Sequence, residues 1–327
     1  MCYNEPMLIV KAIETIGDFG SILVGLFALW SLWTFGFGLL GGWFLSKGTL
    51  SPFPKVKKSD RLLILAPHID DEVLGAAGLI QQTRLAGAEI LVVYATNGDD
   101  NPLSLWGQSR VFDPNDFITL GENRMKEGLK ATARLGLEKK DSLFLGYPDG
   151  GLGPMRHRFF DPGLPYTARG TRFNHNPYRG TYRTGQPYSG SHLCDDLELI
   201  IEDFRPTLII APHPRDSHPD HRALFQFLEK ILEEKENDAR LYAYLVHFRF
   251  WPPKKKLKMN DFLSPPKKLF SGEGWYSLDL SIEQENRKLQ AIEKNASQLT
   301  LATPSDLLRS FVKRNEIFEE IEPAKDE

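Results

Sequence analysis

Two short segments of the chain concentrate side chains that bind metal ions and move protons. They are His68-Ile69-Asp70-Asp71-Glu72 and Asp216-Ser217-His218-Pro219-Asp220-His221. A catalytic zinc ion takes three protein ligands from histidine and carboxylate and keeps a further position for water. We therefore predict that His68, Asp71 and His221 bind zinc, with another divalent metal such as Fe2+ as the alternative.

The other polar residues of the two segments fit hydrolysis. Zinc lowers the pKa of a bound water toward about 7, and Asp70, which need not coordinate, suits the general base for that water. A protonated His218 can stabilise a developing oxyanion or protonate a leaving nitrogen. Asp220 is expected to orient His218 and hold its charge. The pattern predicts a zinc-dependent amide hydrolase.

Each segment has a simpler explanation when it is taken alone. Asp71 or Glu72 can cap a helix, where negative charge is favourable, and an isolated histidine can lie at the surface. Both segments, however, follow apolar runs, and buried charge without a partner is costly. A shared cation explains both. The histidines without a place in this site are expected to be structural or exposed: His157, His175, His192 and His247.

Apolar strands and amphipathic helices alternate along the chain. Residues 61–66 and 207–211 are continuous apolar runs, typical of strands buried on both faces, and each runs into one polar segment. In open α/β sheets, sites lie beyond the carboxyl ends of the strands. Other strands are expected at 90–95, 142–145 and 276–280, and helices at 72–85, 121–135, 194–204, 222–235, from 281, and at 304–321. The alternation predicts an α/β, Rossmann-like fold: a mostly parallel sheet with helices on both faces.

The amino-terminal region predicts one transmembrane helix. Residues 19–46 carry no charge, and about 20 helical residues span the ~30 Å hydrocarbon core. The leader at 1–18 is partly acidic and no clean cleavage site follows, unlike in a signal peptide. Basic residues follow the span, and positive flanks stay cytoplasmic. We expect a single-pass membrane protein whose catalytic domain faces the cytoplasm.

The remaining boundaries follow from composition. We expect a linker at 47–60, a catalytic domain at 61–321 and a charged tail at 322–327. Residues 148–190 form a long loop rich in Gly, Pro, Arg and Tyr. Arginine suits phosphate and aromatic rings stack on sugars, so one hypothesis is a lid over a glycosylated, phosphate-bearing substrate. A solvated, variable loop is the alternative.

Charge and cysteine content narrow the functional class. The formal net charge of −3 gives no global field for nucleic acid, so no nucleic-acid partner is expected. Cys2 and Cys194 are the two cysteines, which argues against a disulfide scaffold and fits a reducing compartment.

Over residues 61–321 the chain resembles the PIG-L/LmbE family of metal-dependent de-N-acetylases. The resemblance rests on the two polar segments together with Thr96-Asn97-Gly98, Glu122 to Glu127, Leu145 to Gly150 and Ser297-Gln298. Ile69 stands where proline is commoner. The resemblance implies zinc on His68, Asp71 and His221, Asp70 as base and His218 as transition-state stabiliser. It also implies substrate contacts for Arg124 and Asp149, which would otherwise be a helix-surface residue paired with Glu127 and a turn residue.

The resemblance also implies a substrate. This would be an N-acetylated amino sugar, as in N-acetylglucosaminyl conjugates, and the anchor favours a lipid-linked one. Two alternatives stay open: a metal-dependent amidase for another amide, and a non-catalytic nucleotide-binding α/β module. The segment Glu72 to Gly78 follows a strand but lacks G-x-G-x-x-G. A phosphoesterase would require a second metal ion about 3.5–4 Å from the first, and no second ligand set is evident.

Overall fold

The computed structural model describes residues 50–101, 113–235, 237–253, 255–270, 273–300 and 302–322. Met1–Leu50 and Ser51–Glu327 are separate units, and all the elements below belong to the second. The transmembrane helix predicted at 19–46 lies outside the described residues. Among the residues that are described, no helix is long and apolar enough to cross a membrane.

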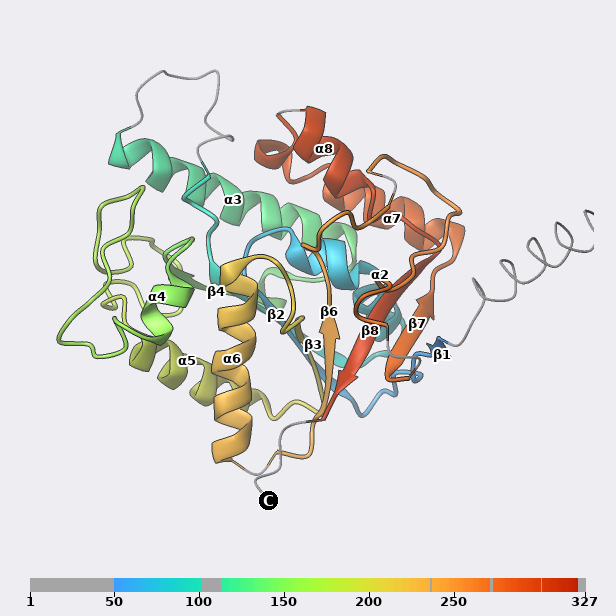
Figure 1. Cartoon of the computed structure of the whole chain (residues 1–327), viewed down its shortest axis with the longest axis horizontal. Coiled ribbons are helices and arrows are strands. Elements are labelled where there is room, and N and C mark those ends of the chain that lie inside the picture. Colours follow the sequence, from blue (N-terminus) through green and yellow to red (C-terminus); the bar gives the residue numbers. More distant parts are fainter. Residues whose placement is uncertain are drawn as a thin grey trace, which may run out of the picture. The chain divides into compact units, whose positions relative to one another are not determined.

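One eight-stranded sheet forms the centre of the domain, in the order β1-β7-β8-β6-β5-β2-β3-β4 (Figure 1). Its strands are β1 Ser51–Pro52, β2 Arg61–Ala66, β3 Glu89–Thr96, β4 Ser142–Tyr147, β5 Leu208–Pro212, β6 Arg240–Tyr244, β7 Trp275–Asp279 and β8 Asn315–Ile321. Strand β8 runs antiparallel to β6 and β7, and the other pairs are parallel. The predicted mostly parallel sheet is confirmed.

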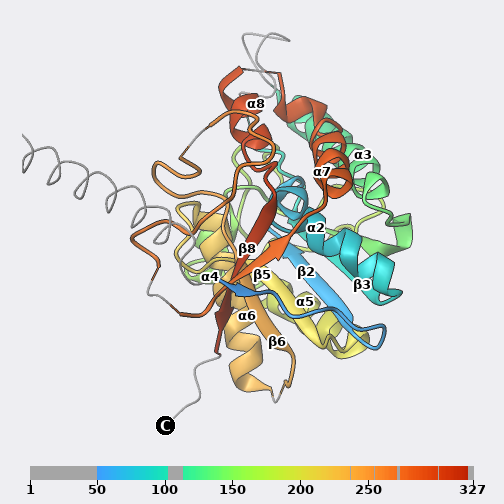
Figure 2. The same ribbon diagram turned by 90° about the vertical axis from the view of Figure 1, so that its right-hand side faces the viewer.

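Helices cover both faces of this sheet, as predicted (Figures 1 and 2). They are α2 Asp71–Ala86, α3 Pro114–Arg134, α4 Leu152–Arg156, α5 Gly190–Phe204, α6 Pro219–Glu234, α7 Ile282–Ile292 and α8 Ala302–Arg309, with short 3-10 turns η2 Lys139–Asp141 and η3 Ala296–Gln298. Alternate residues of β2, such as Leu63 and Leu65, join one core with α4, α5 and α6. Helix α2 packs with α7, and α7 with α3. Burial of the strands on both faces is what their continuous apolar sequences require.

The expected helix at 304–321 is wrong in its second half. Helix α8 ends at Arg309, and Asn315–Ile321 is strand β8 inside the sheet. The acidic residues among the apolar ones resemble an amphipathic helix. In the structure, however, Glu316, Ile317 and Phe318 are 1%, 2% and 0% exposed because β8 lies between β6 and β7. Sheet pairing outweighs the local pattern here. Strand β6 and the short β1, inside the expected linker, were not predicted.

The long loop at 148–190 is packed against the sheet edge. Its Tyr178 and Tyr188 side chains are fully buried. The Tyr178 hydroxyl donates a hydrogen bond of 2.5 Å to Asp99 Oδ2, just after β3, and Asn176 Nδ2 donates to the Leu145 carbonyl of β4 at 2.9 Å. These contacts contradict the solvated-loop alternative. The lid over a substrate stays a hypothesis.

Replacing Tyr178 by Phe should destabilise the domain by about 1–3 kcal/mol, because the buried Asp99 carboxylate loses a donor that water cannot replace. Urea unfolding of the full chain measures the change. Tyr182→Phe is the matched control: this tyrosine belongs to the same loop but is 38% exposed, and the expected change is within about 0.5 kcal/mol. Equal stability of the two variants would show that the loop is not anchored through Asp99.

Candidate metal centre

Parallel pairing of β2 with β5 places the two polar segments side by side. The register aligns Leu62 with Leu208 and Ile64 with Ile210, so both strands end at the same edge of the sheet. Helix α2 begins at Asp71 directly after β2. Helix α6 begins at Pro219, with His218 as its N-cap residue. The site therefore lies where parallel α/β sheets place their sites.

The three predicted metal ligands converge on one point. Asp71 Oδ2 lies 3.2 Å from His68 Nδ1 and 3.1 Å from His221 Nε2. His218 joins them, with its ring 4.6 Å from the His68 ring between centroids. Among the described residues, the possible metal-binding groups divide the predicted ligands between them: His68 and His221 with His218, and Asp71 and His221 with His247. Two nitrogens and a carboxylate oxygen are the ligand types that zinc takes.

A carboxylate lies behind each of the two histidines predicted to be ligands. His221 Nδ1 is 3.2 Å from Asp216 Oδ2, and His68 Nε2 is 3.2 Å from Asp149 Oδ1. Such carboxylates fix the ring orientation of metal-binding histidines and make the ligands more basic. Sequence reasoning gave Asp216 no role. Asp149 was predicted to contact substrate, and the structure adds a contact with His68.

The burial of these atoms fits a bound cation. His68 Nε2 and both ring nitrogens of His221 are buried and lack a hydrogen bond of good geometry among the described residues. Unpaired buried polar atoms are rare and need an explanation. Of these three atoms, His68 Nε2 and His221 Nδ1 face the carboxylates of Asp149 and Asp216. His221 Nε2 faces Asp71, and a metal ion there would satisfy it, so the donor set fits a divalent cation.

The pKa values of His68 and His221 also fit a bound cation. Burial lowers the pKa of His221, but the carboxylates of Asp71 and Asp216 outweigh burial and raise this pKa to about 9. Burial also opposes protonation of His68, yet Asp149 raises its pKa well above the usual value. The carboxylates thus hold positive charge on both histidines. A divalent cation would supply that charge instead.

Asp70 has a strained backbone. Its φ of 132° and ψ of −26° lie in a backbone region that residues other than glycine rarely adopt. Such strain persists mainly at functional sites. The Asp70 amide donates to Glu72 Oε2 at 3.0 Å, and Asp70 Oδ2 lies 3.4 Å from Arg124. Burial raises the pKa of Asp70 to about 7, against the opposing charge of Arg124. Asp70 is thus held next to Asp71, the predicted ligand.

Arg124 holds the turn that contains Ile69 and Asp70. It is 3% exposed, and its guanidinium donates to the Gly98 carbonyl at 2.9 Å and to the Ile69 carbonyl at 2.5 Å. The alternative of a surface pair with Glu127 is wrong, because Glu127 instead accepts two hydrogen bonds from Ser297. Direct contact of Arg124 with substrate stays a prediction, and its observed contacts are with the protein.

Asp220 and His218 are arranged differently from the prediction. The Asp220 carboxylate accepts hydrogen bonds from the Gly150 and Leu152 amides at 2.7 and 3.2 Å. Burial and the cationic His68 and His221 lower the pKa of His218 to about 4. The negative charge of Asp220 raises this pKa, but it is outweighed. His218 Nδ1 accepts from the Asp220 amide at 3.3 Å. The ring is therefore neutral, with its proton on Nε2.

His247 belongs to the site although the sequence predicted a structural or exposed residue. Its ring lies 4.9 Å from that of His221 and 5.3 Å from that of His218, between centroids. With Asp71 and His221 it forms a further group that could hold a metal ion. The signal was absent because His247 follows β6, a strand that the sequence did not reveal.

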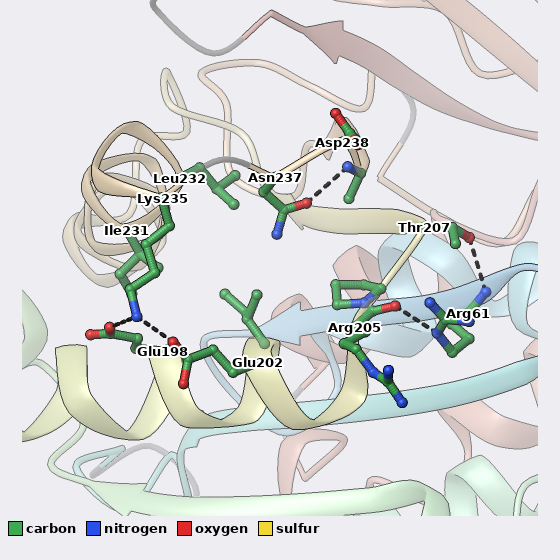
Figure 3. A pocket seen from close by; sticks show the side chains of 13 residues that line it. Arg61, Glu198, Glu202, Arg205, Thr207, Ile231, Leu232, Lys235, Asn237 and Asp238 are labelled. Atoms are coloured by element: carbon green, nitrogen blue, oxygen red, sulfur yellow. Dashed lines mark hydrogen bonds and ion pairs between the residues drawn. The ribbon is translucent and has the colours of Figure 1, made fainter.

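A separate pocket of about 360 Å³ lies at the opposite ends of the strands, near the start of β2 (Figure 3). Lys235 there reaches the carboxylates of Glu198 and Glu202. Among the described residues, none of the possible metal-binding groups falls in this pocket. It is therefore separate from the chemistry of the histidine cluster.

Replacing Asp216 by Asn should weaken zinc binding about 10- to 100-fold, the usual cost of losing a carboxylate behind a metal-binding histidine. Competition with a chelator of known affinity measures the change. Asp195→Asn, on the exposed side of α5, is the control and should bind zinc like the unchanged chain. If both variants bind zinc equally well, Asp216 does not support His221.

Two curated relatives match about half of the chain. A 1D-myo-inositol 2-acetamido-2-deoxy-alpha-D-glucopyranoside deacetylase of Mycobacterium sp. (strain KMS) is 29% identical over 49% of this chain and 46% of its own length. A probable N-acetyl-alpha-D-glucosaminyl L-malate deacetylase 2 of Bacillus subtilis (strain 168) is 24% identical over 55% and 64%. The chain thus spans about half to two thirds of the length of these relatives.

A solved structure and a family model agree with them. A deacetylase triple mutant from the teicoplanin biosynthetic pathway has a TM-score of 0.52 and 20% identity, over 82% of this chain and 100% of its own, which shows a shared fold. The model of the PIG-L family, described as GlcNAc-PI de-N-acetylase, matches residues 63–232. That match spans more than half of the chain and both polar segments, and the protein belongs to the PIG-L family.

Proposed function

We propose that the protein is a metal-dependent hydrolase that removes the acetyl group from an N-acetylated amino sugar conjugate. One observation carries the proposal: His68, Asp71 and His221 meet around Asp71 Oδ2 at 3.1 and 3.2 Å, at the carboxyl edge of the sheet. Membership of the PIG-L family supports the choice of substrate. The inositol and malate conjugates of the two relatives support a sugar with a variable group attached.

The proposed cofactor is a divalent cation, for which we favour zinc. His68, Asp71 and His221 would hold it, with Asp149 and Asp216 orienting the two histidines. Such an ion lowers the pKa of a water molecule and polarises a carbonyl oxygen.

Asp70 is proposed as the general base. It lies beside the ligand Asp71 in a conformation fixed from both sides, by Glu72 at its amide and by Arg124 at its carboxylate. Asp70 takes the proton from the attacking water and returns it to the nitrogen as the C–N bond breaks. The products are acetate and the free amine.

His218 is proposed to stabilise the transition state as a neutral donor. Its Nδ1 accepts from the Asp220 amide, which leaves the Nε2 proton for the oxygen of the acetyl group as negative charge develops there. This role replaces the protonated His218 that the sequence predicted, since burial and two neighbouring cations disfavour the charged ring.

A lipid-linked substrate and a membrane location are further parts of the proposal. The uncharged run at 19–46 and the basic residues after it support a single-pass anchor with the catalytic domain in the cytoplasm. An amidase for another amide conjugate would use the same machinery, and substrate assays separate the two. The nucleotide-binding alternative loses support, because Gly75 and Gly78 inside α2 face the side chains of Tyr244 and Leu280.

Replacing Asp70 by Asn should lower kcat for acetate release about 10²- to 10⁴-fold, the contribution of a general base, while zinc stays bound. The assay uses the full chain with N-acetylglucosamine conjugated to inositol or to malate, and metal content is measured on the same samples. His221→Ala is the companion variant and should lose the metal as well as the activity. Full activity of Asp70→Asn would refute Asp70 as the base.

A further inference from the structure

Helix α2 carries the ligand Asp71 in its first turn and is broken five residues later. Ala76 has φ of −141° and ψ of 16°, which is not helical, although the helix continues to Ala86. Sharp breaks without proline occur at Gly/Ser pairs, at π-bulges or where a group inserts into the hydrogen-bond ladder. In a regular helix the Gly78 amide would donate to the Leu74 carbonyl.

A buried ion pair occupies this break. Glu316 Oε1 accepts from the Gly78 amide at 2.8 Å, and its Oε2 accepts from the Leu79 amide at 3.1 Å. Lys288 Nζ donates to the Leu74 carbonyl at 2.9 Å and to Glu316 Oε1 at 2.7 Å. The pair thus bonds both to the carbonyl and to the amide that a regular helix would join to each other.

Both charges come from beyond residues 63–232, the part that the family model matches. Lys288 belongs to α7 and Glu316 to β8, which lie next to α2 in both views (Figures 1 and 2). Their side chains are 1% exposed. A buried ion pair costs desolvation that its mutual attraction barely repays. Here the remaining hydrogen bonds of both charges go to the backbone of α2, so their structural effect falls on that helix.

The first segment of α2 is also held by close packing. A Cβ on Gly75 would lie 2.3 Å from the Tyr244 ring, so only glycine lets the helix approach β6 this closely. The Tyr244 hydroxyl donates to the Leu65 carbonyl of β2 at 3.1 Å. The segment before the break therefore packs closely on β6, and Tyr244 links this contact to β2; the two strands lie on either side of β5.

We propose that Lys288 and Glu316 are positioning residues for the metal centre. By holding α2 in its broken form, they set the direction of its first turn, and with it the position of Asp71 between His68 and His221. This inference rests on the proposed metal-dependent function. It assigns a role in the site to the carboxy-terminal part of the chain.

The test removes both charges together, because removing one would leave the other buried and unpaired. In Lys288→Met/Glu316→Leu the Gly78 amide should return to the Leu74 carbonyl and the helix should straighten. The expected result for the full chain is a folded protein whose zinc affinity is about 10- to 100-fold lower, as when other supports of metal ligands are lost. The visible spectrum of the cobalt-substituted protein should change as well, because it reports ligand geometry.

The matched control removes an exposed ion pair from the same helix. Arg287 and Glu283 pair at 2.7 Å on the outer side of α7, and Arg287→Met/Glu283→Leu should keep the zinc affinity and the cobalt spectrum. If Lys288→Met/Glu316→Leu also kept both, the proposal would be overturned.

A second variant decides the matter if the double variant does not fold. Lys288→Met/Glu316→Gln also removes both charges but keeps an oxygen for the Gly78 amide. It should bind zinc several-fold more weakly than the unchanged chain, and unchanged affinity would overturn the proposal. Both readouts work without substrate. Absence of acetate release would therefore count against the proposed function alone, and unchanged zinc binding against the positioning role alone.

Discussion

The parallel pairing of β2 with β5 is the constraint on which the site depends. Leu63 pairs with Ile209 in the register between them, so the loops that follow the two strands emerge at the same edge of the sheet. Both faces of these two strands are buried, so a one-residue slip of either would exchange the side chains that face the two helix layers. The strands thus fix the distance between His68 and His221, although about 150 residues separate the two in the chain.

This geometry gathers an excess of buried carboxylates, and the surrounding structure is organised to hold them. Asp71 lies between the two histidines, while Asp149 and Asp216 face their other nitrogens. Asp70 is kept in a strained conformation next to Asp71. Helix α2 is broken where the pair of Lys288 and Glu316 joins it. Each of these features costs free energy, and the proposed cation would give them a common purpose.

The sequence revealed the parts of the protein in which local pattern and tertiary role agree. That His68, Asp71 and His221 come together could be predicted, because each polar segment follows an unmistakable buried strand. Strand β8 could not be predicted, because the acidic residues around Ile317 give it the pattern of an amphipathic helix. Its strand conformation depends on pairing with β6 and β7 on either side. The place of His247 in the site could not be predicted either, because it follows β6, which the sequence did not reveal. The tautomer of His218 depended on one backbone contact, which no spacing encodes.

The central claim is that two distant segments build one divalent metal site. Anomalous diffraction from crystals of the zinc-loaded protein, recorded on both sides of the zinc absorption edge, tests it most directly. The account predicts a single strong peak within about 2.0–2.3 Å of ligand atoms from His68, Asp71 and His221. A protein that takes up zinc but shows no peak among these three residues would contradict it.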